Sequence, residues 1–226
     1  MANVNTTEQE QIRQENIEAK VSATEKFLNE NKKTIWCAVA AVVVAGLAVL
    51  GYQKFIYGPK CEEAMGAAFV AEQNFQAGEY ELALNGDGNV LGIAQVIEEY
   101  GKKAGSALYM EAGICELQLG NYESAVSYLR KYNGKEALLA AKALACEGDA
   151  QVGLGDYKAA VACYEKAAAK ADNIFAAAYL LKAGVAYEAL GNKAAALKCY
   201  ETIKDQYAQS IEGYDIDKYI TRAQAE

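Results

Sequence analysis

The chain has 226 residues, of which 53% are hydrophobic and 23% are charged, and its formal net charge is −8. Histidine is absent, which removes the usual general base and the commonest metal ligand. Proline occurs once, and alanine and tyrosine are frequent, a balance that favours helices over sheet. The composition therefore predicts an all-α protein and argues against an enzyme.

The negative charge is concentrated after residue 60. Residues 61–226 contain 15 basic and 24 acidic side chains, a net charge of −9. Such a domain repels the phosphates of nucleic acids and of anionic lipid surfaces. We therefore expect protein partners and no nucleic acid.

Residues 1–33 are polar and are predicted to form a cytoplasmic tail with a short amphipathic helix over 7–31. Thr7 and Glu10 have the spacing of a capping box. Four side chains then recur at spacings of four, three and four, which places them on one narrow stripe: Ile17, Val21, Thr24 and Leu28. A solvated tail without regular structure is the alternative.

Residues 34–57 are predicted to form a single transmembrane helix. Its centre, IWCAVAAVVVAGLAVLG from Ile35 to Gly51, contains no charged residue. Extension to Tyr57 gives roughly 23 residues and about 34 Å, enough to cross a hydrocarbon core of about 30 Å. A cleaved signal peptide is excluded because the leading segment is long and rich in acidic residues. A buried core helix is less compatible, because the run has no polar face.

Basic residues near this span favour a cytoplasmic N-terminus. Four lysines lie on the N-terminal side of the uncharged centre and two on its C-terminal side: Lys20, Lys26, Lys32 and Lys33, against Lys54 and Lys60. This bias places residues 61–226 outside the cytoplasm, in the periplasm if the membrane is a bacterial inner membrane. Gly58-Pro59 is expected to break or kink the helix, with Pro59 in the first turn of a new one.

Three segments after residue 100 align without gaps. They are LGNYESAVSYLRKY (119–132), LGDYKAAVACYEKA (154–167) and LGNKAAALKCYETI (190–203). Two glycine columns share one register, with Gly113, Gly148 and Gly184 each seven residues before Gly120, Gly155 and Gly191. A period of 35 to 36 residues predicts an internal repeat.

These segments resemble the tetratricopeptide repeat, a helix-turn-helix unit of 34 residues. The resemblance implies that Gly113, Gly148 and Gly184 let the two helices of a repeat touch, and that Gly120, Gly155 and Gly191 end the first helix. It assigns the small position of the second helix to Ala125, Ala160 and Ala196, and the large position to Leu129, Tyr164 and Tyr200. The fold expected is an α-solenoid over 61–226, with an irregular repeat at 61–100, repeats at 104–135, 139–171 and 175–207, and a capping helix at 214–224.

Repeat geometry predicts a concave binding groove on the first helix of each repeat. The side chains expected there are Met110, Ile114 and Leu117 from one repeat, Lys142, Cys146 and Asp149 from the next, and Leu181, Lys182, Val185 and Glu188 from the last. Ile114, Asp149 and Val185 occupy positions where carboxylate-binding repeat domains carry clamp residues, so that type of recognition is not expected. The alternative is that these side chains only seal a tight superhelix.

The six cysteines and the NGDG segment (85–88) predict packing and turn roles. Cys163 and Cys199 occupy equivalent positions in adjacent repeats, about 10 Å apart by ordinary helix packing, which is too far for a disulfide. No CxxC pattern and no phosphate-binding glycine loop occur in the sequence, and NGDG offers a single carboxylate. We therefore expect no cofactor and no metal.

The layout of short tail, one span and acidic repeat domain resembles the YfgM-like family of ancillary Sec translocon subunits. ALNGDG and the helix ending in EEYG also resemble anchored repeat proteins of the Bacteroides and Flavobacterium group. Membership implies partners that include translocon subunits, a membrane-anchored prolyl isomerase chaperone and emerging client polypeptides. Two alternatives remain open: an envelope or cell-division scaffold, and a targeting receptor that faces the cytosol.

Overall fold

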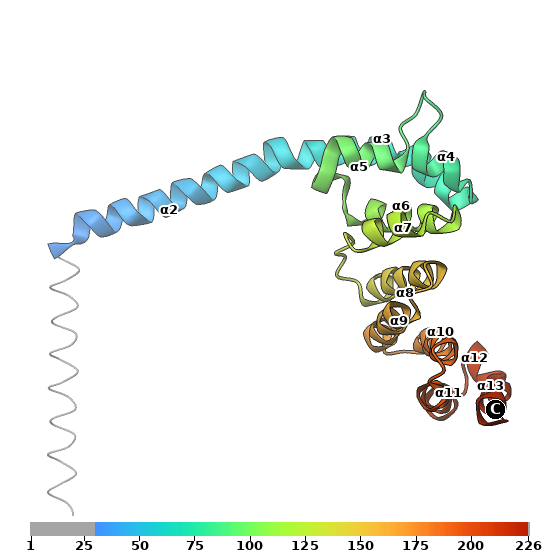
Figure 1. Cartoon of the computed structure of the whole chain (residues 1–226). Coiled ribbons are helices and arrows are strands. Elements are labelled where there is room, and N and C mark those ends of the chain that lie inside the picture. Colours follow the sequence, from blue (N-terminus) through green and yellow to red (C-terminus); the bar gives the residue numbers. More distant parts are fainter. Residues whose placement is uncertain (1–29, 226) are drawn as a thin grey trace, which may run out of the picture. The chain divides into compact units, whose positions relative to one another are not determined.

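The computed structural model describes residues 30–225, which form two compact units that divide between Gly58 and Pro59. The helix predicted over 7–31, with Ile17, Val21, Thr24 and Leu28, therefore lies almost entirely outside the described residues. Figure 1 shows that the described chain is built of helices. Apart from one isolated bridge between Gly86 and Leu91, the described residues contain no β-structure, and the predicted all-α class is confirmed.

The first unit contains α2 (Lys32–Tyr52) and η1, a π-helical turn (Gln53–Tyr57). No residue of either element is buried, although most of α2 is apolar. Within the described residues, the one helical stretch whose length and composition suffice to cross a membrane is Lys32–Ala77, which includes α2. Among residues 30–58, nothing covers the apolar side chains of α2.

The helical residues are not interrupted at Gly58-Pro59, so the predicted break is wrong, although Pro59 does lie in the first turn of α3. Helical residues continue from η1 directly into α3 (Gly58–Ala77), and the Gly58 N–H donates to the Gln53 carbonyl, five residues earlier. A proline has no N–H and its ring crowds the carbonyl four residues before it, here that of Phe55. The wider π-turn shifts the local hydrogen-bond register, which allows Pro59 to follow without ending the helix.

The second unit begins with α3, α4 (Tyr80–Asn85), α5 (Ile93–Tyr100) and the short 3₁₀ turn η2 (Gly101–Ala104). Ala64, Ala68 and Ala71 place one small face of α3 in the same core as Ile93 and Val96 of α5. This is the region predicted to form an irregular repeat, with a second helix interrupted between α4 and α5.

The NGDG segment forms the turn at this interruption. One carboxylate oxygen of Asp87 accepts hydrogen bonds from the N–H groups of Asn89 and Val90, both at 2.9 Å. These bonds lower the pKa of the Asp87 carboxyl. The carboxylate therefore stabilises its own loop, as the sequence predicts for a turn.

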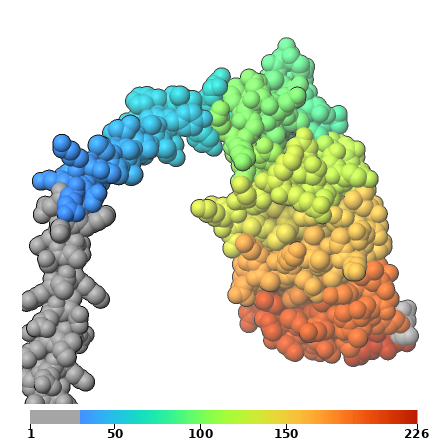
Figure 2. All heavy atoms as spheres, turned by 60° about the vertical axis from the view of Figure 1, so that its left-hand side comes forward, coloured from blue at the N-terminus to red at the C-terminus, as the bar shows by residue number. Residues whose placement is uncertain are grey.

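Three antiparallel helix pairs follow and stack one on the next. They are α6 (Ser106–Gln118) with α7 (Tyr122–Leu129), α8 (Ala137–Gly153) with α9 (Tyr157–Ala171), and α10 (Ala176–Ala189) with α11 (Lys193–Gln206). Figure 2 shows the pairs of this unit as successive layers from green to red. Asp156 and Asn192 cap α9 and α11 by accepting hydrogen bonds from Ala159 and Ala195 N–H groups.

The chain ends with α12 (Ile211–Tyr214) and α13 (Ile216–Ala225). Ile216 is 1% exposed and packs in one cluster with Tyr200 and Ile203 of α11. Tyr219 and Ile220 lie against the same cluster. The last helix thus covers the apolar side of α11 that has no following repeat to bury it.

Candidate interaction surface

The glycines of the first column lie where the two helices of each pair make contact. A Cβ built on Gly113 would lie 2.6 Å from Leu129 Cγ, and one on Gly148 would lie 2.6 Å from Tyr164 Cε1. At Gly184 the distance to Tyr200 Cε1 would be 2.2 Å. Only glycine leaves room for the large side chain of the second helix at these three contacts.

The glycines of the second column lie in left-handed turns. The φ angles of Gly120, Gly155 and Gly191 are 80°, 76° and 71°. After each glycine, the next N–H donates to the carbonyl five residues earlier, as in Asn121 to Glu116. This is the Schellman ending of a helix, which favours glycine because it has no Cβ. The alanines at 125, 160 and 196 are fully buried.

Two members of the predicted groove are buried in the core. Met110 and Ile114 are 8% and 9% exposed and share a cluster with Ala143 and Ala150 of α8. The expectation that they offer free surface to a partner is corrected, because the small alanines let α6 and α8 approach and cover them. Leu117 is half-buried beside the same cluster.

The charged members of the predicted groove pair within the domain. Lys182 donates to both carboxylate oxygens of Asp149, at 2.8 and 2.7 Å, and the Tyr164 hydroxyl donates to the same carboxylate at 2.7 Å. Glu188 pairs with Arg222 of α13. These bonds connect neighbouring repeats and the cap, so they act first as connections within the solenoid.

The remaining predicted groove residues are accessible in part. Lys142 is exposed and makes no ion pair among the described residues, Leu181 is half-buried, and Val185 is 46% exposed. Cys146 is half-buried between them, and burial raises the pKa of its thiol. The open part of the predicted groove is therefore smaller than the sequence pattern implies.

The buried cysteines behave as small apolar side chains. Cys115, Cys163 and Cys199 are at most 9% exposed. Burial raises the thiol pKa to about 12 for Cys115 and to about 11 for the other two. Thiols with such pKa values stay protonated near neutral pH and are poor nucleophiles.

Two carboxylates that the sequence pattern did not single out are buried in whole or in part. Glu147 of α8 is 9% exposed and accepts a hydrogen bond from Arg130 Nε at 2.7 Å. Glu111 of α6 has an oxygen that is buried without a hydrogen-bond partner. Burial and the nearby charge of Glu72 raise the pKa of Glu111 to about 7. Counting back from the turn glycines would have aligned Glu72 and Glu111 with the groove positions.

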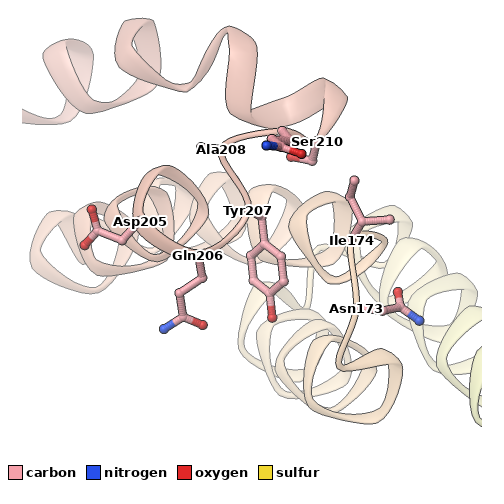
Figure 3. Close-up of a pocket in the computed structure, with 8 residues that line it drawn as sticks. Asn173, Ile174, Asp205, Gln206, Tyr207, Ala208 and Ser210 are labelled. Atoms are coloured by element: carbon pink, nitrogen blue, oxygen red, sulfur yellow. The ribbon is translucent and has the colours of Figure 1, made fainter.

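A shallow hollow of about 460 Å³ lies where the last repeat meets the cap. It is lined by the loop after α9, at Asn173 and Ile174, and by the end of α11 with the loop that follows it, at residues 205–210. Figure 3 shows the Tyr207 ring on the side of Asn173 and Ile174, with Asp205 at the far end of the lining. Within residues 30–225, no three Cys, Asp or Glu side chains gather as they would around a metal ion.

Comparison with known proteins identifies the repeats. Models of the tetratricopeptide repeat match residues 106–133, 141–169 and 178–210. No curated protein matches the chain significantly. Two crystal structures of MamA are similar in fold, both at 18% identity: one has a TM-score of 0.53 and covers 74% of this chain and 88% of MamA, and the other has 0.51, 69% and 93%. Residues 106–210 of the second unit thus contain tetratricopeptide repeats, and such repeats indicate a protein-protein interaction module.

Proposed function

We propose that this protein is a membrane-anchored interaction module, in which α2 holds the chain in a membrane and the repeat domain binds protein partners. The observation that carries the proposal is α2 itself, an apolar helix with no buried residue, joined in one chain to tetratricopeptide repeats. An apolar surface of that size is unstable in water and calls for a lipid or protein environment.

The topology is inferred from the lysine bias. The N-terminus lies in the cytoplasm of a bacterium, α2 crosses the inner membrane once, and the repeat domain lies in the periplasm. The resemblance to YfgM-like proteins supports a role as an ancillary subunit of the Sec translocon. There the domain would act with a membrane-anchored prolyl isomerase chaperone on emerging polypeptides.

A reporter fusion tests the topology. A reporter enzyme that is active only outside the cytoplasm, fused after Glu226, is expected to be active, while the same reporter fused before Met1 stays inactive. An intact fusion after Glu226 that is inactive would reverse the orientation. The domain would then be a targeting receptor that faces the cytosol.

Copurification after cross-linking and mild solubilisation tests the partners. Translocon subunits and a chaperone are expected, whereas cell-wall or division proteins would make the protein an envelope scaffold.

We propose that the accessible groove residues Lys142, Leu181 and Val185 contribute to this binding. Val185→Asp should reduce copurification and leave the fold intact, while Leu154→Asp, at a similarly exposed leucine of the helix turn, should not. Equal recovery with both variants would exclude this part of the groove.

A further inference from the structure

Charge is distributed very unevenly within the second unit. Residues 61–100 contain eight acidic side chains and no basic one, whereas residues 101–226 contain 16 acidic and 15 basic side chains. The ion pairs among the described residues all lie between Arg130 and Arg222. The first 40 residues of the domain therefore form a region of negative charge, and among the described residues no lysine or arginine forms an ion pair with its carboxylates.

An exposed apolar stripe runs along α3 in the same region. Ala64, Ala68 and Ala71 turn one side of α3 into the core, while Met65 is 67% exposed and Phe69 is 58% exposed on another side. Their spacing of four residues places Met65 and Phe69 next to each other on the helix, and Glu72 continues the stripe three residues later. A methionine and a phenylalanine this exposed offer an apolar contact surface bordered by carboxylates.

The repeat register shows what this stripe corresponds to. Ala71 precedes Gly78 by seven residues, as Gly148 precedes Gly155, so Glu72 is equivalent to Asp149. Glu111 is two residues before Gly113, as Lys182 is two residues before Gly184. The pair equivalent to Asp149 and Lys182, which form a salt bridge at 2.7 Å, is thus a pair of glutamates at the first junction.

Among the described residues, the surroundings of the Glu111 carboxylate lack the cation that Lys182 provides at the equivalent position. One carboxylate oxygen is buried without a hydrogen-bond partner, and the negative charge of Glu72 lies close enough to raise the pKa of Glu111. A buried carboxylate without a donor is costly, and an ammonium or guanidinium group would supply both the hydrogen bond and the countercharge.

We propose that Met65, Phe69 and Glu72 of α3, together with Glu111 of α6, form a docking surface for a cationic amphipathic polypeptide segment. Apolar side chains of the segment cover Met65 and Phe69, and a lysine or arginine reaches the two carboxylates. Charge complementarity selects a basic partner and repels nucleic acid and anionic lipid. The exposed apolar pair selects an amphipathic segment over a simple polycation. This inference rests on the proposed function, since it requires a polypeptide partner.

Fluorescence anisotropy with a defined probe tests the proposal. The probe is a short labelled peptide of leucine and lysine arranged at helical spacing, added to the full chain in nonionic detergent, with protein-free micelles as the blank. We expect binding of this peptide. A peptide with serine in place of leucine should bind at least about tenfold more weakly, and one with glutamate in place of lysine should not bind. No binding of the leucine-lysine peptide would overturn the proposal.

A pair of charge-matched variants distinguishes the surface from diffuse attraction. Glu72→Gln with Glu111→Gln should weaken peptide binding by about tenfold or more. Glu98→Gln with Glu99→Gln removes the same charge from α5, where Glu99 lies near Tyr100, and should retain binding. Equal weakening by both variants would contradict a specific surface.

Phe69→Ser provides a second variant that cannot disturb the core, because Phe69 is largely exposed. This substitution should weaken binding of the leucine-lysine peptide by a similar factor. Unchanged affinity would contradict the apolar contact. If the Glu72 and Glu111 variant keeps its natural partners in copurification, this surface is excluded while the proposed function stands. If the wild-type chain copurifies with no partner protein at all, the proposed function itself is contradicted.

Discussion

At the scale of single residues, the contact between the two helices of a pair depends on glycine. Gly148→Ala should destabilise the fold by about 1 to 3 kcal/mol, because the added Cβ meets the ring of Tyr164 at 2.6 Å. Gly66→Ala is the matched control, since nothing lies within 4 Å of that position on helix α3, and it should be neutral or slightly stabilising. Thermal unfolding of both variants gives the comparison.

If Gly66→Ala lowered the unfolding temperature more than Gly148→Ala, α8 and α9 would not pack with Gly148 against Tyr164. A tolerant Gly148 would point to a Tyr164 ring that can move aside. The Tyr164 hydroxyl donates to Asp149, which fixes the ring in place and makes such movement costly.

The carboxyl of Glu111 predicts a pH dependence. Its pKa in the folded state is about 7, above its ordinary value, because of burial first and the charge of Glu72 second. A raised pKa means that the folded chain binds this proton more tightly than the unfolded chain, so this contribution to stability is lost as pH rises from about 4.5 to about 7. Thermal unfolding of the wild type and of Glu111→Gln from pH 5 to pH 8 measures it.

The wild type should lose more stability over this range than Glu111→Gln, which stays neutral. Parallel pH profiles would show that Glu111 is ionised throughout and does not face Glu72 in the folded protein. Carboxyl groups that do not interact with Glu111 contribute equally to both profiles. The difference between the profiles therefore reports Glu111 together with its effect on Glu72.

The glycine and alanine columns could be predicted from the sequence because their spacing is set by the repeat itself. The burial of Ile114 could not, because it depends on how closely the next repeat approaches. Ala143 and Ala150 are small enough for α8 to cover Ile114, whereas Val185 belongs to the last repeat, which no further repeat follows, and stays 46% exposed. The internal pairing of Asp149 with Lys182 was detectable, since opposite charges stand at neighbouring groove positions in consecutive repeats.

At the scale of helices, the end of the solenoid depends on α13. Ile216→Ala should cost about 2 to 4 kcal/mol, because Ile216 is 1% exposed against Tyr200 and Ile203 of α11. Ile211→Ala is the same substitution at an 85% exposed site and should change stability very little. Chemical denaturation measures both, and hydrogen exchange should show faster opening of α11 in the first variant only.

Similar losses from both isoleucine variants would contradict the role of α13 as a cap, because Ile211 is 85% exposed and does not belong to that core cluster. Slow exchange of α11 in Ile216→Ala would likewise show that α11 does not need the last helix. The pairing of Arg222 with Glu188 gives α13 a second attachment, to α10, that this substitution leaves in place.

The connection between the apolar helix and the repeat domain was predicted least well. Gly58-Pro59 is a strong local signal for a break, yet a π-turn over Gln53–Tyr57 lets the helical residues continue. The energy of such a turn depends on a shift of several hydrogen bonds together, which no single residue type signals. The apolar helix itself was readily predicted, because a long uncharged run needs no tertiary context to be detected.

At the scale of the whole molecule, the chain combines an uncovered apolar helix with a domain whose first 40 residues are strongly acidic. The acidic charge keeps that part of the domain away from anionic lipid headgroups and from other copies of itself. The proposed function therefore assigns attachment to a membrane to α2 and the binding of polypeptides to the repeat domain.

Extraction of isolated membranes with alkaline carbonate tests the anchor most directly. The full chain should stay with the membranes, whereas Val43→Lys with Leu47→Lys, two exposed changes in the middle of α2, should be released, since a lysine at the bilayer centre costs about 2.5 to 3.5 kcal/mol. Val161→Ile, a conservative change in the repeat domain, should behave as the wild type. Release of the wild-type chain by carbonate would contradict the proposal that α2 anchors the chain in a membrane.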